Sequence, residues 1–232
     1  MQTTLPLAIM AAAALFPAPA IAASRNFGVS GFDRVRVEGP FAVTLITGTA
    51  PFAKATGSAK GIDGVSIRVE GTTLIISADR SAWSSAGSPA GPVTIAVGTH
   101  ELDYAAVSGT GSLAIDKVRG LDFSLTVSGA GQASIAHVDI DQFKLALAGS
   151  GDTRLAGKAG KFTAIVRGAA SLDASGLIAK DLALTAMGPA TIKAFASGDA
   201  KVAAGGTSTV TLTGSPSCTV KAIGSASVSG CR

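Results

Sequence analysis

The sequence predicts an all-β protein built as a single-stranded parallel β-helix, a solenoid of 18–20-residue coils with an irregular N-terminal β cap. Three observations lead to this fold class. A glycine-centred segment recurs seven times, apolar and polar residues alternate on both sides of each glycine, and no helical period separates the strands. Equivalent residues recur as columns of the same type, which favours coils stacked in parallel over antiparallel hairpins.

The glycine segments follow one another along the second half of the chain: VSGTGSLAI, VSGAGQASI, LAGSGDTRL, VRGAASLDA, AMGPATIKA, AGGTSTVTL and AIGSASVSG. Their glycines lie 20, 20, 19, 20, 18 and 18 residues apart, and we expect each to supply the positive φ of a sharp turn: Gly109, Gly129, Gly149, Gly168, Gly188, Gly206 and Gly224. A second corner in each coil is expected at another set of glycines: Gly120, Gly160, Gly176 and Gly198.

The first copy also matches a dinucleotide-binding pattern. Gly109, Gly111 and Ala114 fit G-x-G-x-x-G/A, in which a glycine turn holds a pyrophosphate at a helix start. The later copies break the pattern, since Ser134 and Arg154 stand where glycine or alanine is required. A turn that occurs once per coil is a structural element, so we expect no nucleotide and no other cofactor here.

Apolar residues at every second position of each repeat predict strands with one buried face. Six residues before successive glycines stand Phe123, Phe143 and Phe162, and this column continues with smaller apolar residues. Coils stacked about 4.8 Å apart bring the three rings into contact. These phenylalanines are therefore the predicted core stack.

Looser strands precede the repeats, at residues 32–37, 41–47, 65–69 and 74–76, and the last two are joined by a turn at residues 70–73. A Ser/Gly/Pro-rich segment follows and carries Trp83, for which we weigh sugar stacking against packing on the first coil. No linker is visible. We expect one domain over residues 23–232, with the regular repeats at 93–232.

Residues 1–22 have the features of a signal peptide. An apolar run (5–15) is followed by Pro17, Pro19 and an A-x-A site that ends at Ala22, although Lys and Arg are lacking before the run. We expect cleavage before Ala23 and a periplasmic or extracellular protein. No later segment is long and apolar enough to span a membrane.

The chain has two cysteines, Cys218 and Cys231, both in the last coil. An even pair this close, in an oxidising compartment, predicts a disulfide. Metal binding and nucleophilic catalysis are the alternatives, but no histidine lies near these cysteines in the sequence to support either one.

The polar residues indicate no reaction centre. His100 and His137 have no partners at metal-ligand spacing, so no metal site is expected. Asp181 and Asp199 stand in neighbouring coils, where a carboxylate pair could act as acid and base, but an exposed pair relieved by Lys161 and Lys201 is the simpler interpretation. The net charge of +4 without a basic run, with one Tyr and one Trp, disfavours nucleic acid as a partner.

Three stretches carry a resemblance to a known family: FDRVRVEGPFAVTLITG (32–48), VSIRVEGTTLIIS (65–77) and the SGTGS, SGAGQ and AGSGD turns (108–112, 128–132, 148–152). Over roughly residues 30–230 the chain resembles the putative auto-transporter adhesin head GIN domains, DUF2807. The resemblance implies a right-handed β-helix in an exported or cell-envelope protein. It identifies no ligand-binding residues.

Two functions are compatible with these observations. The first is a non-enzymatic envelope module, an adhesin-like binding or scaffold protein whose ligand is an unidentified protein or glycan. The alternative is a polysaccharide-acting β-helix enzyme, a lyase or hydrolase, which would need clustered carboxylates, basic residues or Ca²⁺ ligands on one face. The outward columns of the repeats do not supply such a cluster, so we expect no catalytic residues.

Overall fold

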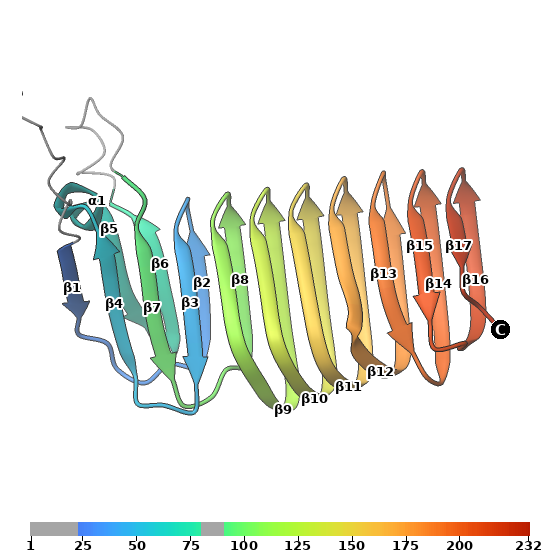
Figure 1. Cartoon of the computed structure of the whole chain (residues 1–232), viewed down its shortest axis with the longest axis horizontal. Coiled ribbons are helices and arrows are strands. Elements are labelled where there is room, and N and C mark those ends of the chain that lie inside the picture. The colour runs from blue at the N-terminus through green and yellow to red at the C-terminus, as the bar shows by residue number, and fades with distance from the viewer. Residues whose placement is uncertain (1–22, 80–90) are drawn as a thin grey trace, which may run out of the picture.

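The computed structural model describes residues 23–79 and 91–232 of the chain. The expected signal peptide (1–22) and Trp83 lie outside the described residues. Within them, one 17-stranded sheet winds around an elongated apolar core, so the predicted β-helix fold is confirmed (Figure 1). No helix in residues 23–79 or 91–232 is long and apolar enough to cross a membrane.

The elements follow one another in this order: β1 (Ala23–Phe27), β2 (Arg34–Glu38), β3 (Ala42–Thr47), β4 (Phe52–Gly57), α1 (Ala59–Asp63), β5 (Val65–Glu70), β6 (Thr73–Ala78), β7 (Thr94–Thr99), β8 (Tyr104–Gly109), β9 (Ser112–Gly129), β10 (Gln132–Gly149), β11 (Asp152–Gly168), β12 (Ser171–Met187), β13 (Thr191–Ala196), β14 (Asp199–Gly206), β15 (Thr209–Thr213), β16 (Ser217–Gly224) and β17 (Ser227–Ser229).

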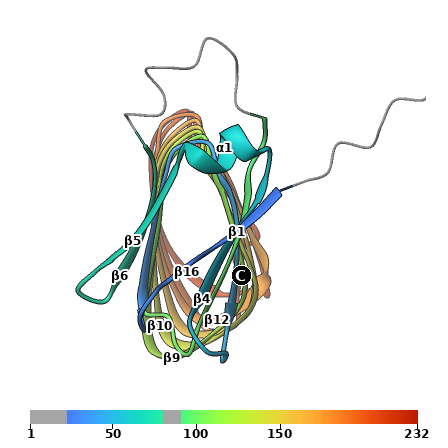
Figure 2. The same cartoon turned by 90° about the vertical axis from the view of Figure 1, so that its left-hand side faces the viewer.

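Each of the strands β9 to β12 makes most of one coil. It starts after one glycine turn, runs along one side of the solenoid, rounds the opposite corner and returns to the next glycine turn. We call the side formed by segments that follow a glycine turn the post-turn flank, and the side formed by segments that end at one the pre-turn flank. Figure 2 shows the two flanks enclosing the core in an end-on view.

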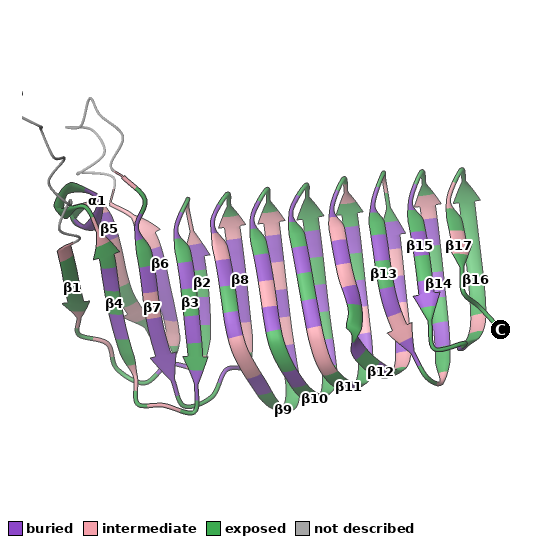
Figure 3. Ribbon diagram, viewed as in Figure 1, coloured by how far each residue is buried: buried purple, intermediate pink, exposed green. Residues whose placement is uncertain are grey.

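Parallel pairing in register places like residues over like residues. Phe123 pairs with Phe143, and Phe143 with Phe162, on successive coils. The three side chains are fully buried, with ring centroids 5.5 and 5.3 Å apart. Figure 3 shows the resulting alternation of buried and exposed residues along the strands. The core is thus a set of columns rather than a set of unrelated contacts.

The glycine turns are tight for two reasons. All seven of the predicted turn glycines have positive φ, for example +120° at Gly149. In addition, a Cβ atom added at Gly149 would lie 2.3 Å from the carbonyl oxygen of Gly129 in the preceding coil. At Gly149 both the backbone conformation and the close approach of the coils therefore require glycine. The Gly109–Gly111 segment joins two strands, β8 and β9, with no helix after it, which leaves no helix start to hold a pyrophosphate.

The opposite corner differs from the expectation. Among the four glycines expected there, only Gly120 has positive φ, whereas Gly160, Gly176 and Gly198 do not. The reason at Gly160 and Gly176 is that β11 and β12 continue through this corner as extended strands, so the chain bends gradually instead of turning sharply. Gly198 lies in the bend between β13 and β14.

The segment 34–47 does not precede the stack but forms a coil inside it. β2 pairs in parallel with both β6 and β8, and β3 pairs in parallel with both β7 and β9. The order of the sequence predicts these residues ahead of the repeats. The structure instead inserts them between strands that come later in the chain.

The N-terminal end of the solenoid is covered by its own elements. β4 pairs antiparallel with β1 and β7, and α1 follows β4 with the Ser58 hydroxyl accepting a hydrogen bond from the Gly61 amide at 3.0 Å. β5 and β6 form the predicted antiparallel hairpin. Its tip projects away from the other strands (Figure 2).

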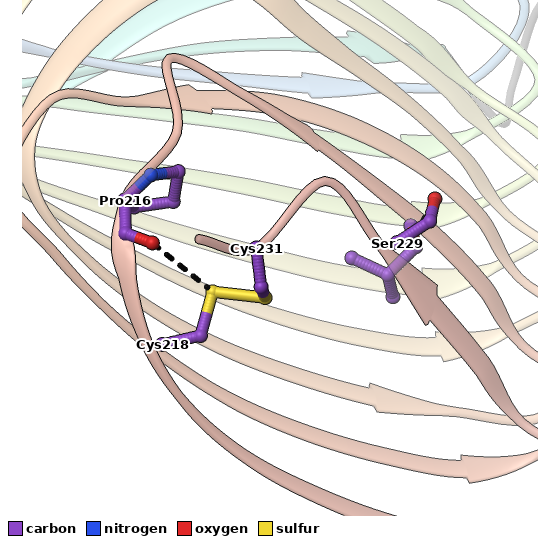
Figure 4. Close-up of a disulfide and its surroundings, with 5 residues drawn as sticks. Pro216, Cys218, Ser229 and Cys231 are labelled. Carbon is purple, nitrogen blue, oxygen red and sulfur yellow. Dashed lines mark hydrogen bonds between the residues drawn. A yellow bond between two sulfur atoms is a disulfide. The ribbon is translucent and has the colours of Figure 1, made fainter.

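The C-terminal end is closed differently. Cys218 and Cys231 form the predicted disulfide, with their Cα atoms 5.7 Å apart (Figure 4). The Arg232 amide also donates a hydrogen bond to the Pro216 carbonyl at 3.2 Å. Val220 lies in an inward column but is 43% exposed, because no further coil covers it among the described residues. The last coil is therefore held by covalent closure more than by burial.

Replacing Phe143 by alanine is expected to lower the free energy of unfolding by about 3–5 kcal/mol, because a large ring flanked by two others leaves a cavity. Chemical denaturation measures the change. Leu121→Ala is the control, since Leu121 is 72% exposed and its loss should change the stability by no more than about 0.5 kcal/mol. Equal effects of the two substitutions would contradict the core assignment.

Removing the disulfide with Cys218→Ala and Cys231→Ala is expected to destabilise the last coil by about 3 kcal/mol, because the bond closes a loop of 13 residues. Hydrogen exchange measured by mass spectrometry should then show faster exchange in residues 217–229. Exchange in β9, β10 and β11 should stay unchanged. Faster exchange throughout the stack would show that the bond supports more than the terminal coil.

Candidate functional site

The residues that the sequence analysis singled out lie in the framework of the solenoid. The turn glycines form one edge of the stack, the three phenylalanines fill the core, and Cys218 and Cys231 close the last coil. The outward columns of the two flanks are the largest remaining part of the described surface, so a contact site is expected there first.

The polar residues weighed for catalysis lie far from one another or on the surface. His100 and His137 are both exposed, and Nδ1 of His137 lies 3.3 Å from the carbonyl oxygen of Asp116. Asp181 and Asp199 lie side by side on neighbouring coils, since the residues that follow them, Leu182 and Ala200, are paired. Among the described residues, no three His, Cys, Asp or Glu side chains are grouped so that they could hold a metal ion.

An open hollow of about 560 Å³ lies on the post-turn flank and crosses β3, β9, β10, β11 and β12. Its exposed lining is formed mainly by small side chains and one glycine: Ala114, Ser134, Ala136, Ala156 and Gly176. Its charged side chains are Asp116, Arg154 and Asp173. We call this hollow the flank groove.

The flank groove continues toward the glycine turns. A second hollow, of about 320 Å³, shares Ala114, Ser134 and Arg154 with it and adds Gln132 and Asp152. Arg154 thus stands between the two hollows, with its side chain exposed. The two hollows form one surface with a single guanidinium near its centre.

The coils change length at the flank groove. Two residues separate Ile135 from Val138 in β10, but only Ala156 separates the corresponding residues of β11, and the register shifts there. A further shift follows between β11 and β12. Gly157 accommodates the change: its φ is +126°, and a Cβ atom there would lie 2.2 Å from the Val138 carbonyl oxygen. The local irregularity of the ladder coincides with the floor of the groove.

A row of alternating charges crosses the flank groove. In the ladder Arg154 pairs with Asp173, and Asp173 pairs with Lys193 on the next coil. The hydroxyl and the amide of Ser175 both donate hydrogen bonds to Asp173 Oδ1, at 2.6 and 3.2 Å. These two bonds, aided by Lys193 and Arg154, lower the pKa of Asp173. Asp173 is thus a fixed anion, which suits it to binding and not to proton transfer near neutral pH.

The Asp116 side chain stabilises the contact between β3 and β9. Its Oδ1 accepts hydrogen bonds from the amides of Thr47 at 2.9 Å and Lys117 at 2.7 Å. The Thr47 hydroxyl in turn donates to the Lys117 carbonyl at 2.9 Å. This network joins the end of β3 to β9 across a sequence separation of 69 residues. The carboxylate therefore fixes the inserted coil at one end of the flank groove.

The flank groove is not predicted by the sequence. Its one signal was the interval of 19 residues between Gly149 and Gly168, which follows two intervals of 20. A missing residue shows that a coil is shorter, but not on which flank the shortening falls.

The family described as "Putative auto-transporter adhesin, head GIN domain" has a model that matches residues 31–216 of this chain. A search of the curated proteins found no match.

Solved structures share the fold. A crystal structure of a "putative adhesin" from Bacteroides fragilis superposes with a TM-score of 0.82 at 18% identity, over 89% of this chain and 95% of that one. A "Putative lipid binding protein" from Parabacteroides distasonis gives 0.68 at 18% identity, over 90% and 96%. A "putative adhesin" from Parabacteroides merdae gives 0.65 at 12% identity, over 91% and 96%. At these identities the likeness concerns the fold alone.

Proposed function

Because this chain belongs to the family of putative auto-transporter adhesin head GIN domains, we propose that it is an exported cell-envelope solenoid that binds an extended ligand along its post-turn flank. The ligand is a protein or a glycan. The protein is a binding or scaffold module and not an enzyme.

The observation that carries this proposal is the flank groove. It crosses five strands, so at about 4.8 Å per strand it runs roughly 19 Å along the solenoid axis. A groove of this shape suits several sugar units or a short extended segment of polypeptide. Stacked coils with a regular core present such a surface rigidly, which lowers the entropic cost of binding.

The side chains of the flank groove suit recognition. Its small residues let a ligand approach the backbone, while Arg154 offers several N–H donors and Asp173 offers carboxylate acceptors. Hydroxyl groups from Thr44, Ser134 and Ser175 stand along it at intervals. Donors and acceptors that alternate over an apolar floor match a polar chain with an apolar face.

Export is supported by the family and by the disulfide, since disulfides persist in oxidising compartments. We propose that residues 1–22 are removed as a signal peptide and that residues 23–232 act as one domain in the periplasm or outside the cell. The sequence basis is the apolar run and the A-x-A site before Ala23.

Mass spectrometry of the protein recovered from its host checks the export proposal. The mature chain should begin at or near Ala23 and fractionate with periplasmic or extracellular proteins. An intact segment 5–15 in the recovered protein would refute it.

Filling the flank groove should abolish binding of the ligand. We expect residues 23–232 to bind at least one glycan on an array or one protein extracted from the envelope, and Ala136→Trp to weaken that binding at least tenfold by occupying the floor. Ala203→Trp is the matched control, because Ala203 is also exposed but lies on the pre-turn flank. Equal binding by the two variants would exclude the groove as the ligand site.

A further inference from the structure

A separate hollow, of about 400 Å³, lies on the pre-turn flank near the N-terminal end of the solenoid. Its lining comes from four segments that are distant in sequence: β2, the β5–β6 hairpin, β8 and the part of β9 that approaches Gly129. They meet only because the coil formed by residues 34–47 is inserted between β6 and β8. We call this hollow the hairpin pocket.

The hairpin pocket has two apolar side chains at its base, Ile75 and Ala106, within a lining that is otherwise mostly polar. Ile75, Arg36, Ala106 and Thr126 follow one another across the ladder on the outward side of the sheet. Ile75 and Ala106 are each only 6% exposed, although the outward side of the sheet otherwise faces solvent. The surrounding longer side chains therefore shield a small apolar base, and the short side chain of Ala106 leaves room above it.

Three charged side chains and one tyrosine line the pocket, and contacts with neighbouring side chains hold them in place: Arg34, Arg36, Glu70 and Tyr104. Arg36 Nη2 lies 2.7 Å from Glu38 Oε1, and Arg68 Nε lies 2.7 Å from Glu70 Oε1. The Arg34 guanidinium lies 4.7 Å from the centroid of the Tyr104 ring. Ion pairs and a cation–π contact orient these groups before any ligand arrives.

The charges around the pocket nearly cancel. Of the two arginines that line the pocket, Arg36 has Glu38 as its carboxylate partner, and Arg34 forms no ion pair within the described residues. Arg68, which does not line the pocket, pairs with the lining residue Glu70. Two acids lie beside it, Asp33 and Asp103. Burial, together with the charges of Asp33 and Glu101, raises the pKa of Asp103, and the Arg34 guanidinium partly offsets this rise. Since Arg34 stands among acids, the pocket offers no surplus of positive charge to an anion.

From this arrangement we infer that the hairpin pocket binds a neutral sugar ring, one unit of a glycan. The C–H face of the ring lies over the small apolar base formed by Ile75 and Ala106. Around it, arginine N–H groups donate to sugar hydroxyls, while the Glu70 carboxylate and the hydroxyls of Thr73, Ser108 and Thr126 accept from them. The inference does not rest on the flank groove, which lies on the opposite flank.

Tyr104 is the only tyrosine of the chain, so its ring is a unique spectroscopic reporter of the pocket. The experiment uses residues 23–232 with labelled tyrosine and records the ring signals by NMR during titration with cellotriose, maltotriose and chitotriose. Trigalacturonate is the anionic comparison. We expect saturable shifts with at least one neutral trisaccharide and weaker binding of trigalacturonate.

Two variants locate the effect. Ala106→Leu fills the space above the floor, and Arg34→Gln removes the cation held against Tyr104, so each should weaken binding about tenfold or more. Lys201→Ala, on the same flank but several coils away, should leave binding unchanged. Thermal melting shows whether each variant is folded. If Ala106→Leu does not fold, Arg34→Gln alone tests the inference.

The absence of any shift with the neutral trisaccharides at about 10 mM would overturn the inference, since a useful subsite should bind in the millimolar range. So would tighter binding of trigalacturonate, or unchanged binding in Arg34→Gln. Ala136→Trp separates this result from the proposed function, because it fills only the flank groove and should leave the Tyr104 shifts unaltered.

Discussion

Every coil of this protein must follow the course of the coil beside it. The backbone groups of neighbouring coils pair in parallel, which holds the chains about 4.8 Å apart along most of each turn. Which residue type fits at a position therefore depends on the residue at the equivalent position of the neighbouring coil. Phenylalanine stacks on phenylalanine, and glycine approaches glycine so closely that no side chain fits. The regular core, the sharp turns and the flat flanks all follow from this pairing.

The same constraint explains how much the sequence reveals. Parallel pairing repeats residue types at a fixed interval, so the column of Phe123, Phe143 and Phe162 and the turn glycines can be read directly from the sequence. The disulfide could be predicted because both cysteines fall in one coil. The second corner could not be described correctly from the sequence. A positive φ favours glycine, whereas a gradual bend in an extended strand requires no particular residue type.

The sequence does not reveal that some strands pair in an order different from their order along the chain. Val35, Val37 and Gly39 repeat the pattern of Ala105, Val107 and Gly109, but nothing in an interval of 70 residues suggests that they are neighbours. The hairpin pocket depends on that pairing, so its members cannot be assembled from the sequence. The flank groove depends instead on a register shift of one residue, whose position along the coil becomes visible only in the structure. Both hollows lie where the repeat departs from regularity.

The inserted coil also has a consequence for how the chain assembles. Pairing Tyr104 with Ser124 closes a loop of 20 residues, whereas pairing Arg34 with Tyr104 closes one of 70. The longer closure costs about 1 kcal/mol more in chain entropy, and it cannot be completed until β8 offers an edge. The regular coils need only short closures, and each one formed becomes the template for the next. The N-terminal strands are thus the ones that should dock last, onto a stack built from residues that follow them in the chain.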